Sequence, residues 1–166
     1  MNNMIRYINF GDDVRLRYRK TFQGIYKELA GDRDSGKEGL LFQDNGELFL
    51  FCANLGLKEG EKSEAGKLLE SSEFRFSSIK GNYLRTLYFL VAVMGGDGLK
   101  NESFEDAKSL KTIVERYADA GMEILLAQFL KDYFEFRKDQ YTYIGERESI
   151  DFHKSWLYYL LELKQD

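Results

Sequence analysis

Hydrophobic residues recur at helical spacing in several parts of this chain, and residues 40–57 show the pattern most clearly. The apolar face of this stretch consists of Leu48, Phe49, Phe51, Cys52 and Leu55. Asp44 or Asn45 is expected to cap the first turn, and Gly56 to end the helix in the left-handed conformation. Because so wide an apolar face must be covered, the pattern predicts a helix packed against other helices.

The first thirty residues predict an extended arm followed by a basic helix. Residues 4–10 are few and rich in β-forming types, so we expect a short strand there. Asp12 and Asp13 suit the start of a helix that runs to about Ala30. Its apolar residues recur at helical spacing: Val14, Tyr18, Phe22, Ile25, Tyr26 and Leu29. Residues 73–79 alternate phenylalanine with polar types, which predicts a second strand, with the arm as its obvious partner.

The remaining pattern predicts four more helices. The first, residues 82–94, is apolar on nearly every side and is therefore expected at the centre of the protein. Two helices follow, at 103–119 and 122–136, separated by a tight bend at 118–121. A helix at 149–163 closes the structure. The predicted fold is mainly α: one domain of residues 1–166, a bundle of five to six helices with a short strand pair near the N-terminus. It comprises the arm and basic helix 1–30, the core helices 42–136 and the closing helix 149–163.

Composition adds three expectations. The 166 residues include no proline, 15 glycines and 15% aromatic residues, which favours long helices around an aromatic core. The single cysteine, Cys52, allows no internal disulfide, as is usual in a reducing cytoplasm. No signal segment opens the chain and no run of 18 apolar residues occurs, so we expect a cytoplasmic protein without a membrane partner.

Charge is distributed unevenly along the chain, although the net value is only −4. Residues 1–30 hold six Lys/Arg against three acids, and residues 101–166 hold nine against fourteen. The basic cluster predicts contact with nucleic acid or with an acidic partner. Its candidate residues are Arg6, Arg15, Arg17, Arg19 and Lys20. The alternative is a solvated helix face that pairs with Asp12 and Asp13.

Aromatic residues are denser near residues 122–143 than one helix face requires. Some of these rings are candidates for contact with another protein, and the alternative is ordinary core packing. The candidates are Tyr133, Phe136, Tyr141 and Tyr143.

Residue types that carry chemistry are sparse. The single histidine, His153, has no local nucleophile signature around it, and Cys52 on an apolar face is an inert small hydrophobe. Glu162 and Lys164 have the E-x-K spacing of some metal-dependent nucleases, without an upstream Asp or strand to complete a site. Sequence therefore predicts no enzyme, no cofactor and no metal site.

Two tracts carry a resemblance to a known family. The first tract comprises Phe42, Glu47, Leu48, Phe49, Phe51, Ala53, Leu55, Gly56, Leu57, Lys58 and Gly60, followed by the apolar helix near 87–94. The second, residues 113–125, reads IVERYADAGMEIL. Over about residues 42–130, the chain resembles the small DNA phosphorothioation-associated (Dnd-system-associated) proteins of bacterial phage-defence islands. The resemblance implies a helical accessory protein that acts with larger defence proteins on DNA, with no catalytic residues to carry over.

The preferred hypothesis is a non-catalytic accessory or scaffold subunit of a prokaryotic anti-phage defence or DNA-processing complex, acting by protein–protein contact. Its partners would be larger ATPase or nuclease subunits, with DNA and a second copy of the chain as further candidates. The alternative is a ribbon-helix-helix-like DNA-binding regulator that uses the basic arm and helix. A metal-dependent nuclease is the third reading.

Overall fold

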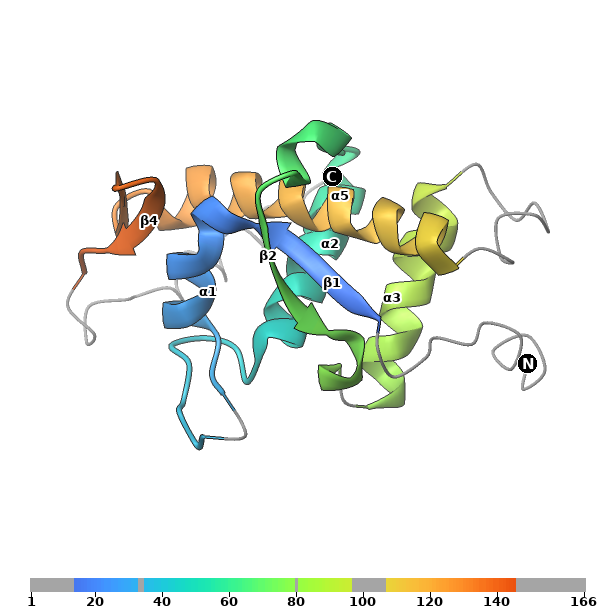
Figure 1. Cartoon of the computed structure of the whole chain (residues 1–166), viewed down its shortest axis with the longest axis horizontal. Coiled ribbons are helices and arrows are strands. Elements are labelled where there is room, and N and C mark those ends of the chain that lie inside the picture. Colours follow the sequence, from blue (N-terminus) through green and yellow to red (C-terminus); the bar gives the residue numbers. More distant parts are fainter. Residues whose placement is uncertain (1–13, 33–34, 80, 97–106, 146–166) are drawn as a thin grey trace, which may run out of the picture.

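The structure, a computed structural model, describes residues 14–32, 35–79, 81–96 and 107–145 (Figure 1). This part of the chain is mostly helical, as predicted, but it holds four α-helices and two antiparallel strand pairs, fewer helices than expected and one strand pair more. The elements are β1 Arg15–Arg19, α1 Gln23–Leu29, α2 Asn45–Glu59, β2 Ser71–Arg75, α3 Asn82–Gly95, α5 Ala107–Leu125, β3 Phe134–Arg137 and β4 Gln140–Tyr143.

Helix α2 begins where the sequence predicted. The left-handed glycine that ends it lies four residues after Gly56, the predicted position. The Asp44 carboxylate accepts a hydrogen bond of 2.9 Å from the Glu47 backbone N–H, which caps the first turn. Gly60, with φ of +69°, ends the helix, so the prediction for Gly56 is wrong. Gly56 is instead buried against α5, where a Cβ would lie 2.2 Å from the Tyr117 carbonyl oxygen. Its small size serves packing.

Helix α5 is continuous through the residues that predicted a bend. It runs the length of the molecule in Figure 1, from the α3 end to the β4 end. Gly121 lies inside it, and a Cβ there would sit 1.8 Å from the Cys52 carbonyl oxygen of α2. The glycine therefore lets two helix backbones approach closely, and the predicted turn at 118–121 is wrong. Leu126–Leu130 form a π turn that ends the helical segment.

The predicted basic helix is also wrong in its first half. Residues 15–19 form β1, which pairs antiparallel with β2 and places Leu16 opposite Phe74. Leu16 and Tyr18 are buried, and the three arginines between and beside them are not. This period of two is typical of a strand that covers a core on one face. The strand predicted at 4–10 and the closing helix predicted at 149–163 lie outside the described residues.

A second strand pair replaces the predicted C-terminal end of the 122–136 helix. In this β3–β4 hairpin, Phe134 lies opposite Tyr143 and Phe136 opposite Tyr141. Lys138 and Asp139 form the two-residue turn, with φ of 49° and 63°. Two consecutive left-handed residues are the geometry of a type I′ turn, which usually contains Asn-Gly or Asp-Gly.

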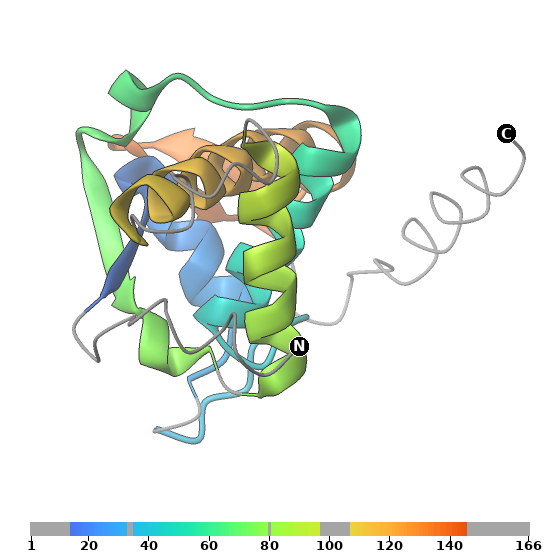
Figure 2. The same ribbon diagram turned by 90° about the vertical axis from the view of Figure 1, so that its right-hand side faces the viewer.

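Helix α3 has nearly the predicted bounds but not the predicted central position. Its inner face, which includes Tyr88, Val91 and Ala92, packs on the core. Tyr83 and Met94 are 74% and 69% exposed on the other side. Figure 2 shows α3 at one end of the molecule, with no other described element in front of it. An apolar composition on all sides therefore does not mean burial here.

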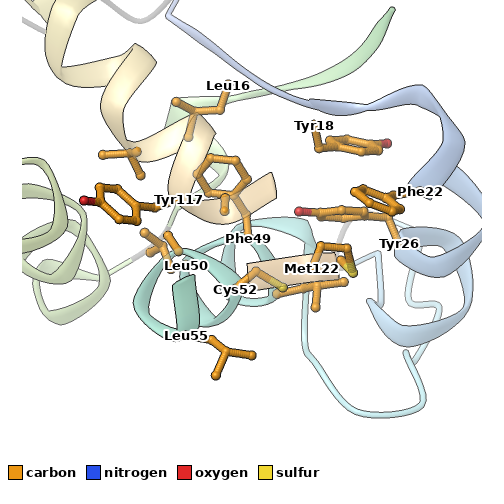
Figure 3. Close-up of a cluster of buried hydrophobic side chains, with 14 of the residues drawn as sticks. Leu16, Tyr18, Phe22, Tyr26, Phe49, Leu50, Cys52, Leu55, Tyr117 and Met122 are labelled. Carbon is orange, nitrogen blue, oxygen red and sulfur yellow. The ribbon is translucent and has the colours of Figure 1, made fainter. Parts of the chain in front are cut away.

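Buried side chains from all of these elements except β4 form one core cluster, against which Tyr141 and Tyr143 of β4 pack. Figure 3 shows the part of this cluster to which β1, α1, α2 and α5 contribute. Leu16 of β1 and Phe49 of α2 are fully buried at its centre. The rings of Tyr18 and Tyr26 stack with centroids 3.9 Å apart, which joins β1 to α1. Cys52 is fully buried, as predicted. Within the described residues, the structure contains no helix that is both long and apolar enough to cross a membrane.

Candidate interaction surface

The basic residues of β1 face a row of acids on α5. Glu115, Asp119 and Glu123 are spaced four apart, so they lie on one side of the helix, about 6 Å apart along its axis. Arg17 and Arg19 are two apart on a strand, which separates them by roughly 6.7 Å. Because the two spacings nearly match, successive arginines meet successive carboxylates.

Arg17 binds Glu115 through both its backbone and its side chain. The Glu115 carboxylate, which is fully buried, accepts the Arg17 backbone N–H at 2.8 Å and a guanidinium N–H at 2.9 Å. The backbone contact occupies a position on the edge of β1 that β2 leaves unpaired. Lys111 lies 3.5 Å from the same carboxylate. A single glutamate thus covers a strand edge and neutralises the arginine beside it.

Arg19 continues this network one helical turn further along α5. Its guanidinium donates to both oxygens of buried Asp119, and to Glu123 at 2.8 Å. Lys67 also reaches Glu123, at 3.1 Å. Partial burial raises the pKa of the Glu123 carboxyl, but hydrogen bonds from Arg19 and Lys67 outweigh it, so that the pKa is lowered. Glu123 is therefore held as a carboxylate.

The structure separates the five basic candidates. Arg17 and Arg19 are engaged with α5, and Arg15 forms an exposed pair with Glu73 at 2.7 Å. Lys20 is exposed, and Arg6 lies outside the described residues. The prediction of a basic cluster that faces outward took no account of the acidic row Glu115, Asp119 and Glu123. The E-x3-D-x3-E spacing of this row is the sequence signal that indicates an acidic helix face able to pair with the arginines.

By contrast, the structure brings the four aromatic candidates together at one end of the molecule. Phe136 packs edge-on against Tyr141, with ring centroids 5.1 Å apart, and 53% of Phe136 remains exposed. Tyr143 packs edge-on against buried Phe134 at 5.4 Å. Tyr133 precedes β3, and its carbonyl oxygen accepts the Ile144 backbone N–H at 2.8 Å. We call Tyr133, Phe136, Tyr141, Tyr143 and Ile144 the hairpin surface.

The hairpin is held firmly against the body of the protein. Tyr141 stacks on Phe22, with centroids 5.9 Å apart. At Gly24 of α1, a Cβ would lie 1.9 Å from the Tyr141 carbonyl oxygen, so α1 and β4 meet backbone to backbone. A two-stranded hairpin alone is marginally stable. These contacts give its exposed rings a fixed orientation.

A cleft of about 490 Å3 lies between α1 and β4, next to the hairpin surface. Its lining combines aromatic rings with amides and a few charges: Tyr18, Gln23, Gly24, Tyr26, Lys27, Glu28, Asn45, Gln140, Tyr141, Thr142 and Tyr143. Aromatic anchors surrounded by polar groups are typical of protein–protein interfaces. The site therefore offers both an apolar contact and hydrogen-bonding groups around it.

Cys52, the one chemical candidate from the sequence that the structure describes, does not lie at this surface. Cys52 is buried in the core, and that burial raises the pKa of its thiol far above the usual value. No group of three or more His, Cys, Asp or Glu side chains suited to a metal ion occurs among the described residues. His153, Glu162 and Lys164 lie outside them. Comparison of the chain with protein-family models, curated proteins and solved structures found no match.

Proposed function

We propose that this protein is a non-catalytic accessory or scaffold subunit that acts by protein–protein contact, with the hairpin surface as its binding site. The observation that carries the proposal is Phe136, a large aromatic side chain that is 53% exposed and oriented by its contact with Tyr141. Rigid aromatic side chains at the centre of an interface contribute much of the binding free energy of protein complexes.

The surroundings of Phe136 suit a protein partner. Ile144, 50% accessible, is a further exposed apolar side chain at the open end of the hairpin, whereas Phe136 lies next to the turn. Glu135 and Arg137 pair with each other on the opposite face of β3, so the charges of that strand are balanced locally. The cleft beside β4 supplies amide and hydroxyl groups that form hydrogen bonds at an interface rim.

The resemblance of residues 42–130 to Dnd-system-associated proteins indicates the class of partner. It implies larger proteins of a prokaryotic anti-phage defence or DNA-processing complex, such as an ATPase or a nuclease. The DNA-binding alternative has less support, because Arg17 and Arg19 are engaged by carboxylates of α5. Duplex DNA would have to displace those carboxylates to reach them.

The test is binding to a purified ATPase or nuclease subunit encoded beside this chain. Isothermal titration calorimetry measures the dissociation constant of this complex for the unmodified full chain and for the variant Phe136→Ser. Loss of a central aromatic anchor is expected to weaken binding by at least tenfold, or about 1.4 kcal/mol. Because Phe136 is half exposed in the free protein, thermal unfolding of the variant should change little.

Leu69→Ser is the matched control. Leu69 is 84% exposed and lies between η2 (Ala65–Leu68) and β2, away from the hairpin surface. The control should bind as the unmodified chain does. Equal binding by the Phe136→Ser variant would exclude the hairpin surface as the contact site, and no binding by the unmodified chain to either class of subunit would contradict the accessory role.

A further inference from the structure

Helix α3 carries a second exposed apolar surface, distinct from the hairpin surface. Tyr83, Leu90 and Met94 are 74%, 48% and 69% exposed, and Leu87 lies half-buried between them. The four residues are separated by four, three and four positions, so they form one row along the outer face of the helix. We call them the α3 row. Arg85 is the only charged residue in α3.

The exposed α3 row is expected to bind another protein surface. Single exposed apolar side chains are ordinary on a protein surface, but contiguous rows of large ones usually mark an interaction site. Among the described residues, six large hydrophobic side chains are exposed, and three of them belong to this one helix. Spacing of four and three residues is also the pattern by which one helix packs along another.

The order of the spacings favours a second copy of the same chain as the partner. The sequence four, three, four reads the same from either end, so a two-fold axis beside the middle of the row places each of its residues opposite one residue of the row in the other copy. In an antiparallel pair, Leu87 of one copy meets Leu90 of the other, and Tyr83 meets Met94. Methionine sulfur against an aromatic ring is a favourable contact. Such a self-complementary patch is what an isologous dimer requires.

The charges at the two ends of α3 agree with the antiparallel arrangement. The helix begins at Gly81 without a side-chain cap and without an acidic residue in its first turn, and Arg85 follows. Its last turn has no basic residue. The N-terminal end is therefore positive and the C-terminal end negative. An antiparallel pair places opposite ends together, whereas a parallel pair places like ends together.

We propose that the α3 row is a self-association surface on which two copies of this chain dock with their α3 helices antiparallel. This goes beyond the proposed partner contact, because α3 and the hairpin lie at opposite ends of α5 (Figure 1). A dimer formed through α3 presents two hairpin surfaces facing away from each other. Two linked sites bind a multivalent partner more tightly than one site does.

The dimer is expected to be weak and reversible. Four side chains from one helix cover less than the roughly 800 Å2 that each partner buries in a stable complex, so dissociation constants in the micromolar range are expected. The first test is sedimentation equilibrium of the full chain between about 5 and 500 μM, a range that brackets such constants. The average mass should rise with concentration from monomer towards dimer.

Leu90→Glu is the test variant, because it places a charge at the centre of the row and opposite an apolar partner. It should raise the dissociation constant by at least tenfold. Leu69→Glu is the matched control, since Leu69 is more exposed than Leu90 but lies outside α3. This control should associate as the unmodified chain does. Monomers at every concentration, or equal association by Leu90→Glu, would overturn the proposal.

Cysteine cross-linking tests the orientation. Tyr83→Cys and Met94→Cys are oxidised separately and as a mixture, with Cys52 shielded in the core. The antiparallel pair predicts disulfide-linked dimers in the mixture and few in either variant alone. Efficient cross-linking of Tyr83→Cys to itself would show a parallel pair and overturn the antiparallel assignment. Neither experiment involves Phe136, so its outcome is separate from that of the proposed function.

Discussion

Arg17 and Glu115 form the contact that joins the edge of β1 to α5. The glutamate has no exposed area, while the Arg17 side chain remains 37% exposed. When Glu115 is removed, water can therefore solvate the Arg17 guanidinium. Water reaches the backbone N–H of Arg17 less easily, so that donor loses its hydrogen-bond partner. The pair differs in this respect from Arg15–Glu73, in which both side chains are about half exposed.

Replacing Glu115 by alanine should destabilise the fold strongly. Breaking a buried ion pair by removing one partner typically destabilises a protein by about 3–5 kcal/mol, and partial exposure of Arg17 reduces this to about 2–3 kcal/mol. Glu73→Ala removes an exposed pair and should change the free energy of unfolding by less than about 1 kcal/mol. Urea unfolding of both variants measures the difference. A similar loss of unfolding free energy in both variants would show that burial of the Glu115 pair does not increase its contribution to stability.

At the scale of elements, the glycines of the α2–α5 contact have the largest structural effect. Gly56 and Gly121 lie where the two helix backbones touch, and neither has a left-handed backbone. Helix propensity alone favours alanine over glycine by about 1 kcal/mol. The tertiary contact opposes this preference, because a methyl group on Gly121 would overlap the Cys52 carbonyl.

Gly121→Ala should therefore destabilise the protein despite improving the helix. The backbones must separate to admit the methyl group, and overpacking of this kind typically reduces stability by about 1–3 kcal/mol. Gly66→Ala is the control, since nothing lies within 4 Å of a Cβ at Gly66. Thermal unfolding distinguishes the two. An increase in melting temperature for Gly121→Ala would contradict the close approach.

The β3–β4 hairpin shows how an element can be overlooked. Its strands read FEFR and QYTY, an alternating pattern, but Phe134 and Phe136 also continue the helical spacing of residues 122–133. The turn residues, Lys138 and Asp139, give no Gly or Asn signal for a two-residue connection. Packing of Tyr141 on Phe22 and the close approach at Gly24 favour the hairpin, and neither contact is visible in local sequence.

At the scale of the whole molecule, part of the charge asymmetry is neutralised internally. The basic N-terminal stretch and the acidic later part of the chain meet at the β1–α5 contact. Residues that are 98 and 100 positions apart in the chain bind each other there. Uneven charge along a sequence therefore does not require an external partner of opposite charge.

The network also makes stability depend on pH. The folded-state pKa of Glu123 is lowered by Arg19 and Lys67, so its contribution is present above the unfolded pKa of about 4.3 and is lost as pH falls through the lower folded value. Urea unfolding at pH 7 and at successive values below 4.3 should show this loss. In Glu123→Gln, the decline over the same range should be smaller. An equal decline in both proteins would assign the pH dependence to other carboxyl groups.

Local signals in the sequence determined the start of α2, a cap at Asp44 or Asn45, the approximate bounds of α3 and the burial of Cys52. Each depends on neighbouring residues, so hydrophobic spacing and capping chemistry are enough to predict it. Residues 15–19 fit two local patterns, the helical spacing of residues 14–29 and the alternation RLRYR, and tertiary structure decided for the strand. It also decided that α5 continues through Gly121 and that one face of α3 is left exposed. The first two outcomes depend on contacts with residues far away in the chain, such as Glu115 and the Cys52 carbonyl, and such contacts override local preference because they bury charge and backbone together. The outer face of α3 is exposed because no described element packs on it.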